Sequence, residues 1–218
     1  MRRTLEPEVM DTAEEALQYD AMDNAGPNRA FVERLVSLGA TGKVLDIGSG
    51  PGHIPLLLVE RLSNVSVIGV DLSQHMLRHA ELRRARSAHA ARVEFRMADA
   101  KNLPFPRESF DVVASNTILH HISDPRRFIS EAWRVLRPGG TFLIRDLFRP
   151  PTPERASELV RTHAGSASPE QQRLLLASLH AALEPEELRA FAREAGLVGV
   201  NLTIDSDRHM SLEARARR

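Results

Sequence analysis

The sequence predicts an α/β protein with a doubly wound, Rossmann-like, mostly parallel sheet and helices on both faces. Two observations predict this fold. Between residues 43 and 144, short apolar runs rich in β-branched residues alternate with longer segments of helical periodicity, which is typical of βαβ units. The apolar runs are also nearly continuous, as expected for parallel strands that are buried on both faces.

Five such runs are expected to form the core strands. In chain order they are Val44–Ile47, Val65–Val70, Val93–Met97, Phe110–Ser115 and Thr141–Asp146. The helix before the fifth strand has the clearest boundaries, with Asp124 as N-cap and Pro125 at the first helical position. We expect that helix to end at Arg137-Pro138-Gly139-Gly140, where proline stops the helix and the two glycines permit a reversal.

The flanking segments are expected to be less regular. Pro27 is predicted to open a helix, whereas residues 1–26 have weak periodicity and are expected to wrap across the domain. Pro153, Pro169 and Pro185 each begin a helical pattern, the last ending at Gly196, so about fifty residues separate two strands that a short crossover could join. A strand is predicted over residues 197–204, and a final antiparallel strand from about His209.

These elements predict one domain with four parts. They are an N-terminal helical cap (1–40), a cofactor-binding core (41–146), a helical insertion or lid (147–196) and C-terminal strands (197–218). An insertion of this length commonly forms a lid or a substrate wall. We therefore expect the cap and the insertion to close over a ligand.

The composition excludes several classes of function. Apolar residues make up 42% and charged residues 27% of the 218, as in globular proteins, and 29 basic residues balance 29 acidic ones, so nucleic acid is not an expected partner. The chain has no cysteine, which excludes disulfides and thiol nucleophiles, and no metal is expected. Because it has no long apolar run and no leader-like N-terminus, we expect a cytoplasmic protein without membrane contact. Nothing in the sequence indicates an oligomeric state.

A glycine-rich loop follows the first predicted strand. Gly48, Gly50 and Gly52 alternate with other residues, which leaves room for a ligand against the backbone. The spacing differs from the dinucleotide pattern G-x-G-x-x-G because the third glycine comes one residue early. With Asp46 beside it, this loop better suits a cationic amino acid portion than a pyrophosphate, although Asp46 can instead bind its own loop.

The next two strand ends carry further carboxylates. Asp71 ends the second strand, where it can accept hydrogen bonds from both hydroxyls of a ribose. Ser73 is expected to cap the following helix, and Met76 on its first turn either covers an adenine face or belongs to the core. Asp99 ends the third strand and can receive an exocyclic amine. One sheet edge therefore offers sites for an amino acid, a ribose and a base.

In this respect the chain resembles the class I S-adenosylmethionine-dependent methyltransferases, whose motifs occur in the same order. The matching segments are Asp46–Gly52, Val70–Ser73, Ala98–Ala100, Phe110–Val113 and Leu136–Gly140. The resemblance implies a seven-stranded sheet with the last strand antiparallel and S-adenosyl-L-methionine at its carboxyl edge. It also implies that the three glycines surround the methionine portion, that Asp71 holds the ribose and that Asp99 binds adenine. The full cofactor-binding set expected is Asp46, Gly48, Ser49, Gly50, Gly52, Asp71, Leu72, Met76, Asp99, Ala100 and Asn116.

For catalysis, the cofactor's sulfonium already makes the methyl group electrophilic, so the protein needs to supply binding and orientation for an in-line displacement. A general base is optional. The candidates are His120 and His121, which follow the fourth strand, and Asp146 at the end of the fifth. Their ordinary alternatives are a histidine in a turn and an aspartate in a salt bridge.

Three functions remain open at this stage. The segment Asp99–Phe110, with Leu103-Pro104-Phe105, resembles the branch that methylates small molecules, so we expect a small-molecule methyl acceptor. RNA or protein methylation is the second possibility, disfavoured by the balanced charge and by Ser115-Asn116-Thr117-Ile118 in place of an Asn-Pro-Pro-Tyr type of motif. The third is a cofactor-binding protein without turnover.

Overall fold

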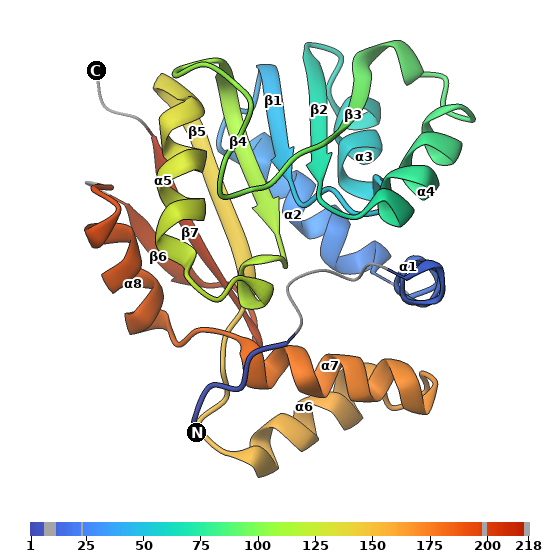
Figure 1. Cartoon of the computed structure of the whole chain (residues 1–218), viewed down its shortest axis with the longest axis vertical. Helices are drawn as coiled ribbons and strands as arrows, with labels where there is room; N and C mark the ends of the chain where they lie inside the picture. The colour runs from blue at the N-terminus through green and yellow to red at the C-terminus, as the bar shows by residue number, and fades with distance from the viewer. Residues whose placement is uncertain (7–11, 23, 198–199, 216–218) are drawn as a thin grey trace.

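A seven-stranded mixed sheet forms the centre of the computed structural model, which describes residues 1–6, 12–22, 24–197 and 200–215 (Figure 1). The strand order is β3-β2-β1-β4-β5-β7-β6. Strands β1 to β5 run parallel, and β7 is antiparallel to both β5 and β6, which confirms the predicted fold class. The strands are β1 (Gly42–Ile47), β2 (Val65–Asp71), β3 (Val93–Met97), β4 (Phe110–Asn116), β5 (Leu136–Leu147), β6 (Asn201–Ile204) and β7 (His209–Arg215).

Helices cover both faces of this sheet (Figure 1). One apolar cluster joins β1, β4 and β5 to α5 and α8, and a second joins the opposite face to α2 and α3. Strands β1, β2, β4 and β5 contribute to both clusters because successive side chains point to opposite faces. The helices are α1 (Ala13–Asp20), α2 (Ala25–Ser37), α3 (His53–Arg61), α4 (Gln74–Arg84), α5 (Pro125–Val135), α6 (Pro153–Ala164), α7 (Pro169–Ala181) and α8 (Pro185–Glu194), with the short 3-10 turns η1 (Ala90–Arg92) and η2 (Leu119–His121).

The predicted helix starts are largely confirmed. The Asp124 carboxylate accepts a hydrogen bond from the N–H of Arg126 at the start of α5, and Ser73 accepts one from Met76 at the start of α4. Each helix of the insertion has its predicted proline in the first turn, Pro153 in α6, Pro169 in α7 and Pro185 in α8. Proline suits this position because the N–H that it lacks has no partner within the helix.

Three predicted boundaries are wrong. Helix α2 begins at Ala25, two residues before Pro27, because Asn24 and not Pro27 precedes its first turn. Strand β5 begins at Leu136 instead of Thr141, so the segment expected to be a turn lies inside the strand, which is irregular opposite β4. Strand β6 begins at Asn201; Leu197 is not in a strand, and the predicted residues 198–199 lie outside the described residues.

The insertion lies across the carboxyl edge of the parallel strands. Figure 1 shows α6 and α7 crossing below the strand ends, with the N-terminal segment running alongside α7. Hydrogen bonds hold this segment in place. Thr4 donates its backbone N–H to the carbonyl of His180. The Arg3 guanidinium donates to three backbone carbonyls, those of Ala181, His120 and Ile122. Helices α6 and α7 have a separate apolar cluster, which includes Leu147, Leu159 and Leu179. None of the helices in the described part of the chain is long and apolar enough to cross a membrane.

Candidate functional site

A first pocket lies at the carboxyl edge of β1, β2 and β4. Its wall contains Gly48 and Gly50 from the glycine loop, Asp71 and Leu72 from the end of β2, and Asp99 from the end of β3. Met76 and Ala100 also line it. The structure therefore brings together seven residues that the sequence predicts for one ligand, from three consecutive strand ends.

The glycine loop has the left-handed backbone that these glycines allow. The φ angles are 74° at Gly48, 52° at Gly50 and 83° at Gly52. A β-carbon on Gly48 would collide with the side chain of Ile118, which lies over the loop and narrows the pocket to about 110 Å³. Ile118 therefore packs directly against the glycine loop at the wall of this pocket.

Two predicted members of the loop have other surroundings. A β-carbon on Gly52 would lie 2.6 Å from the ring of Phe95 and 3.1 Å from Ala80, so this glycine allows the loop to pack against β3 and α4. Ser49 is buried, and its hydroxyl oxygen has no hydrogen-bond partner among the described residues. Neither residue lines the pocket.

Asp71 holds the glycine loop against the end of β2. Its Oδ2 accepts a hydrogen bond from the N–H of Gly50 at 2.8 Å, and its Oδ1 accepts one from Ser73 at 2.9 Å. Burial raises the pKa of Asp71, while these backbone N–H groups oppose the increase. Each carboxylate oxygen retains a lone pair, so Asp71 can also accept hydrogen bonds from a diol in the pocket.

Asp46 is a buried carboxylate without a partner. It is only 2% exposed, and neither of its oxygens has a hydrogen bond to any residue that the structure describes. Burial, with a smaller contribution from the charge of Asp71, raises its pKa to about 7. Such a group is unfavourable unless a ligand supplies a donor or a positive charge. Asp46 does not line the pocket itself.

Asp99 stands at the outer end of the pocket. Its carboxylate accepts a hydrogen bond from the N–H of Lys101 at 2.8 Å, and the Lys101 ammonium lies 3.1 Å away. Partial burial favours a higher pKa, but the contacts with Lys101 outweigh it, and the pKa of Asp99 lies below its usual value. Asp99 therefore remains a hydrogen-bond acceptor at neutral pH.

Tyr19 is a site residue that the sequence reasoning missed. It lies on α1, lines the pocket, and is the side chain nearest to the space beside Gly50. Helix α1 is held there by Asp20, which contacts His53 at 2.9 Å, His79 at 3.2 Å and Arg83 at 2.5 Å. The only sequence signal was an aromatic residue in a segment of weak periodicity.

A second, larger cavity of about 500 Å³ adjoins the first. Tyr19, Thr117 and His121 line both, and so form the boundary between them. The larger cavity is also lined by residues of α6 and α7 and by the turn between β6 and β7. Asn116, predicted to contact the cofactor, lines this second cavity instead.

The boundary between the cavities contains strained backbone. Thr117 has a φ of 58°, which is rare for a β-branched residue. Its N–H donates to the carbonyl of Arg145, so the end of β4 is held in place by β5. Strain of this kind is commonly found at functional sites, where the surrounding structure compensates for it.

His120 and Asp146 form a buried pair beside the larger cavity. The two side chains are 3% and 2% exposed, and His120 Nδ1 lies 2.6 Å from Asp146 Oδ1. Burial opposes charging of both groups, but their mutual attraction outweighs it, so the pKa of His120 is raised and that of Asp146 is lowered. Since Nδ1 contacts Asp146, the other ring nitrogen of His120, Nε2, is available to contact a molecule in the larger cavity.

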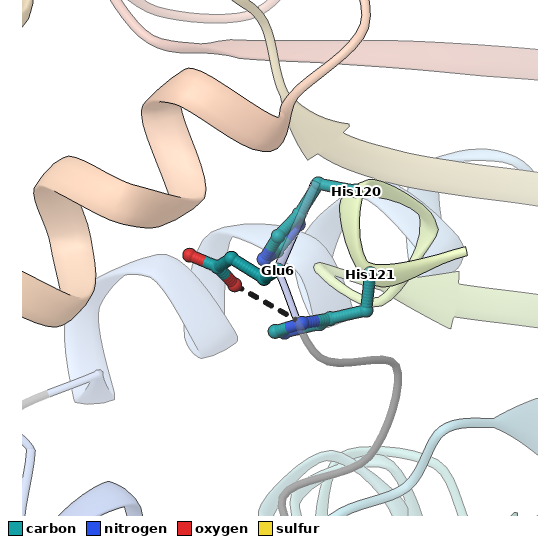
Figure 2. Close-up of side chains that lie close together, drawn as sticks. All are labelled: Glu6, His120 and His121. Atoms are coloured by element: carbon teal, nitrogen blue, oxygen red, sulfur yellow. Dashed lines mark ion pairs between the residues drawn. The ribbon is translucent and has the colours of Figure 1, made fainter. Parts of the chain in front are cut away.

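His121 and Glu6 form a neighbouring pair. Figure 2 shows Glu6 and the two imidazoles facing one another, and His121 Nδ1 lies 3.1 Å from the Glu6 carboxylate. One ligand atom from each of Glu6, His120 and His121 falls within 4.8 Å of the others, so these residues can also hold a metal ion. However, each imidazole already faces a carboxylate, His120 that of Asp146 and His121 that of Glu6.

Comparison with known proteins finds the same fold and chemistry. Residues 45–144 match the family described as "Methyltransferase domain". Over 164 residues the chain is 35% identical to the 27-O-demethylrifamycin SV methyltransferase of Amycolatopsis mediterranei, covering 75% of this chain and 56% of that protein. It is 34% identical over 189 residues to the demethylmenaquinone methyltransferase of Clavibacter sepedonicus, covering 80% and 74%. The chain thus spans only about half the length of the first relative.

Solved structures show the same arrangement of elements. The crystal structure of a putative S-adenosyl-L-methionine-dependent methyltransferase from Methanococcus maripaludis aligns with a TM-score of 0.72 at 19% identity, over 100% of this chain and 98% of that one. Phosphoethanolamine N-methyltransferase 2 of Haemonchus contortus, in complex with S-adenosylhomocysteine, aligns with a TM-score of 0.71 at 19% identity, over 95% and 58%. At these identities the likeness concerns the fold.

Proposed function

Because the chain belongs to the class I S-adenosylmethionine-dependent methyltransferases, we propose that it transfers the methyl group to a small molecule bound in the larger cavity. The observation that carries this proposal is the pair of adjoining cavities with a shared boundary at Tyr19, Thr117 and His121. One has the residues for the donor, and the other has the volume of a typical small-molecule site.

The first pocket fits S-adenosyl-L-methionine. Asp46 does not line the pocket, but its unpartnered carboxylate, two residues before Gly48, would attract the ammonium of the methionine portion, and the glycine loop would let the backbone approach that portion. Asp71 would accept hydrogen bonds from the ribose, Asp99 would accept one from the adenine amine, and Met76 and Leu72, which line the same pocket, would cover the base. When bound, the cofactor supplies an electrophilic methyl group on its sulfonium.

The protein's own contribution is orientation, desolvation and a base. Tyr19 and Thr117 align the acceptor with the first pocket, and α6 and α7 exclude water from the cavity. The free ring nitrogen of His120 takes a proton from the acceptor, while Asp146 fixes the ring orientation and stabilises the protonated imidazole. Asp146 lines neither cavity, so it is a positioning residue.

A small molecule is favoured over a macromolecule by the shape of the larger cavity. Residues of α6, α7 and the N-terminal helices line it together with the ends of β4 and β5, so it is a concave site of about 500 Å³, a size that suits a small molecule. The named relatives also act on small molecules, namely a demethylrifamycin and a demethylmenaquinone.

The proposal is tested by incubating the full chain with methyl-labelled S-adenosylmethionine and a metabolite extract, followed by mass spectrometry. We expect labelled small-molecule products with the wild type and none with Gly50→Val, whose added side chain needs a strained backbone and blocks the loop. Asp71→Ala should weaken cofactor binding by about 1 to 3 kcal/mol in calorimetry. If the folded wild type binds neither the cofactor nor S-adenosylhomocysteine, the proposal fails. Cofactor binding without any labelled product would instead indicate a non-catalytic binding protein.

A further inference from the structure

The larger cavity has an uneven charge distribution. Two arginines, Arg145 and Arg208, line it together with four histidines: His120, His121, His163 and His209. No aspartate or glutamate lines it among the residues that the structure describes. This is unexpected in a chain whose basic and acidic residues are equal in number.

Arg145 is the centre of this positive charge. It is 6% exposed, and no carboxylate within the described ranges lies close enough to form an ion pair with it. Its Nε donates to the side-chain oxygen of Asn116 at 2.9 Å, its Nη2 donates to the carbonyl of Pro27 at 2.7 Å, and the guanidinium lies 5.0 Å from the ring of Phe31. These neutral contacts fix its position but leave its charge unbalanced, which is costly in a buried group. Burial lowers the pKa of Arg145 to about 10, so it is still charged at neutral pH.

The surroundings of Arg145 do not cancel this charge. Asp146 is engaged by His120, and Asp207 lies 2.8 Å from His163 and 3.6 Å from Arg208, outside the cavity wall. Asp205 attracts Arg145 only from a distance and contacts Ser211 and Thr203. His209 lies close enough to be affected by this charge. Burial, followed by the charges of Arg145 and Arg208, lowers the pKa of His209 to about 3.

We propose that the methyl acceptor carries a carboxylate, and that this carboxylate binds Arg145 at the inner end of the larger cavity, with Arg208 as a second donor. The inference rests on the proposed function, because it names the class of acceptor for that same site. A single negative charge matches a single unbalanced arginine, and a planar guanidinium recognises a carboxylate through paired hydrogen bonds. The Nη1 of Arg145 makes no hydrogen bond within the described part of the chain and can donate to such a ligand.

The remainder of the cavity suits an apolar body. Leu147, Leu174 and Leu175 line the side formed by β5 and α7. The base candidate His120 lies on the same wall, beside the boundary with the first pocket. A molecule with its carboxylate on Arg145 and its apolar part against the leucines therefore fits beside His120 and the first pocket.

The test compares the binding of two probes of nearly equal size, one negatively charged and one neutral. Benzoate and benzamide are titrated into the full chain saturated with S-adenosylhomocysteine, and binding is followed by calorimetry or ligand-observed NMR. We expect benzoate to bind at least about tenfold more tightly than benzamide, which corresponds to one charge-assisted hydrogen bond. Because the cofactor pocket is already filled, benzoate cannot bind there, and the variants described next distinguish the larger cavity from other basic sites, such as the pocket lined by His53, His79, Arg83 and Arg86.

Variants assign the binding to Arg145. Arg145→Gln should remove the preference for benzoate while leaving affinity for S-adenosylhomocysteine unchanged, and Arg145→Lys should restore part of it. If Arg145→Gln does not fold, Arg208→Gln serves as the second variant, because it leaves the contacts of Arg145 with Pro27 and Phe31 intact. Arg208→Gln should reduce the preference for benzoate. Arg173→Gln is the matched control, since it removes the same charge from an exposed position of α7 and should change nothing.

A second arm examines the product itself. Labelled product from the metabolite extract should be retained on an anion-exchange column at neutral pH and should resist phosphatase. A neutral product overturns the inference, as does equal affinity for benzoate and benzamide. Tighter binding of phenyl phosphate than of benzoate overturns the carboxylate in favour of a phosphate. In each of these outcomes cofactor binding and methyl transfer can persist, whereas loss of cofactor binding by the wild type refutes the proposed function itself.

Discussion

Three carboxylates at the carboxyl edge of the sheet, two buried and one partly buried, differ in what neutralises them. Asp71 accepts backbone N–H groups, Asp146 pairs with His120, and Asp46 has no partner among the described residues. The first two contacts stabilise the fold without a ligand. The third is unfavourable until a ligand is bound, so Asp46 is the residue at which cofactor affinity and stability of the free protein should oppose each other.

The first prediction concerns Asp46→Asn. Because burial raises the pKa of Asp46 from 3.8 to about 7, the folded state loses stability as the pH rises from about 4 through 7. Removing the charge should therefore raise the free energy of unfolding at pH 8, by roughly 1 to 4 kcal/mol. The same change should weaken cofactor binding about tenfold, since the ammonium loses its counter-charge. Denaturant unfolding and calorimetry measure the two effects.

The pH dependence of the wild type provides the control. The proposed contact of Asp46 with the cofactor ammonium needs the ionised carboxylate, so we expect affinity to increase between about pH 6 and 8 and to depend less on pH in Asp46→Asn. A variant that is less stable than the wild type at pH 8 would show that Asp46 has a stabilising partner.

The second prediction concerns the His120–Asp146 pair. Because the pKa of His120 is raised above 6.5, the rate of methyl transfer should rise with pH with a midpoint above that value. Asp146→Asn removes the charge that raises this pKa, so the midpoint should move to lower pH and the maximal rate should fall about 10- to 100-fold. Single-turnover transfer from labelled cofactor measures both changes.

The same pair also affects stability, with signs that can be checked. The raised pKa of His120 stabilises the fold below pH 6.5, and this stabilisation is lost as the pH rises through the pKa that His120 has in the folded state. The lowered pKa of Asp146 stabilises the fold above about pH 4. The destabilisation by Asp146→Asn should therefore be largest between about pH 4 and 6.5. Addition of a chelator should not alter the rate profile; a loss of activity would show that Glu6, His120 and His121 hold a catalytic metal.

At the scale of elements, the sequence predicted what local chemistry determines. Asp124 with Pro125 marks the start of α5, and the continuous apolar runs identify the parallel strands, because caps and burial patterns depend on neighbouring residues. The start of β5 was missed since its first residues pair with Phe110 across a bulge, which proline and two glycines conceal in the sequence.

The candidate site was predictable only where strand ends supply it. Asp71, Asp99 and the glycines follow apolar runs, so topology alone places them on one edge. Tyr19 was not predictable, because α1 is held by ion pairs between Asp20 and residues of α3 and α4 that lie distant in sequence. The cavity charge was hidden as well, since Arg145 looks like any strand-end arginine until its surroundings are known.

The third prediction concerns the attachment of α1. Asp20→Ala leaves His53, His79 and Arg83 without their shared carboxylate, so α1 should detach more readily from the pocket. We expect cofactor affinity to fall about three- to tenfold while the free energy of unfolding changes by less than about 1 kcal/mol, since these groups are partly exposed. Calorimetry and denaturant unfolding test this. Glu33→Ala, which breaks an exposed pair with Arg61, should leave affinity unchanged.

The whole molecule contains two apolar clusters that flank the sheet and a third, smaller one beneath α6 and α7. The first two share the strands and must open together. The third cluster meets the sheet only through Leu147 at the end of β5. The part of the fold that covers the larger cavity can therefore open while the sheet remains intact, which gives an acceptor a route in.

The fourth prediction follows for hydrogen exchange of the full chain. Backbone amides of α6 and α7 should exchange faster than those of β1, β4 and β5, because opening them disrupts only the smallest cluster. S-adenosylhomocysteine should slow exchange in α1 and in the loop from Gly48 to Gly52, which contact the first pocket, but should leave α6 and α7 nearly unchanged. Protection of α6 and α7 should require a ligand in the larger cavity, such as benzoate. If S-adenosylhomocysteine alone protects α6 and α7 as strongly as the sheet, the two cavities close as one unit, and acceptor entry must precede cofactor binding.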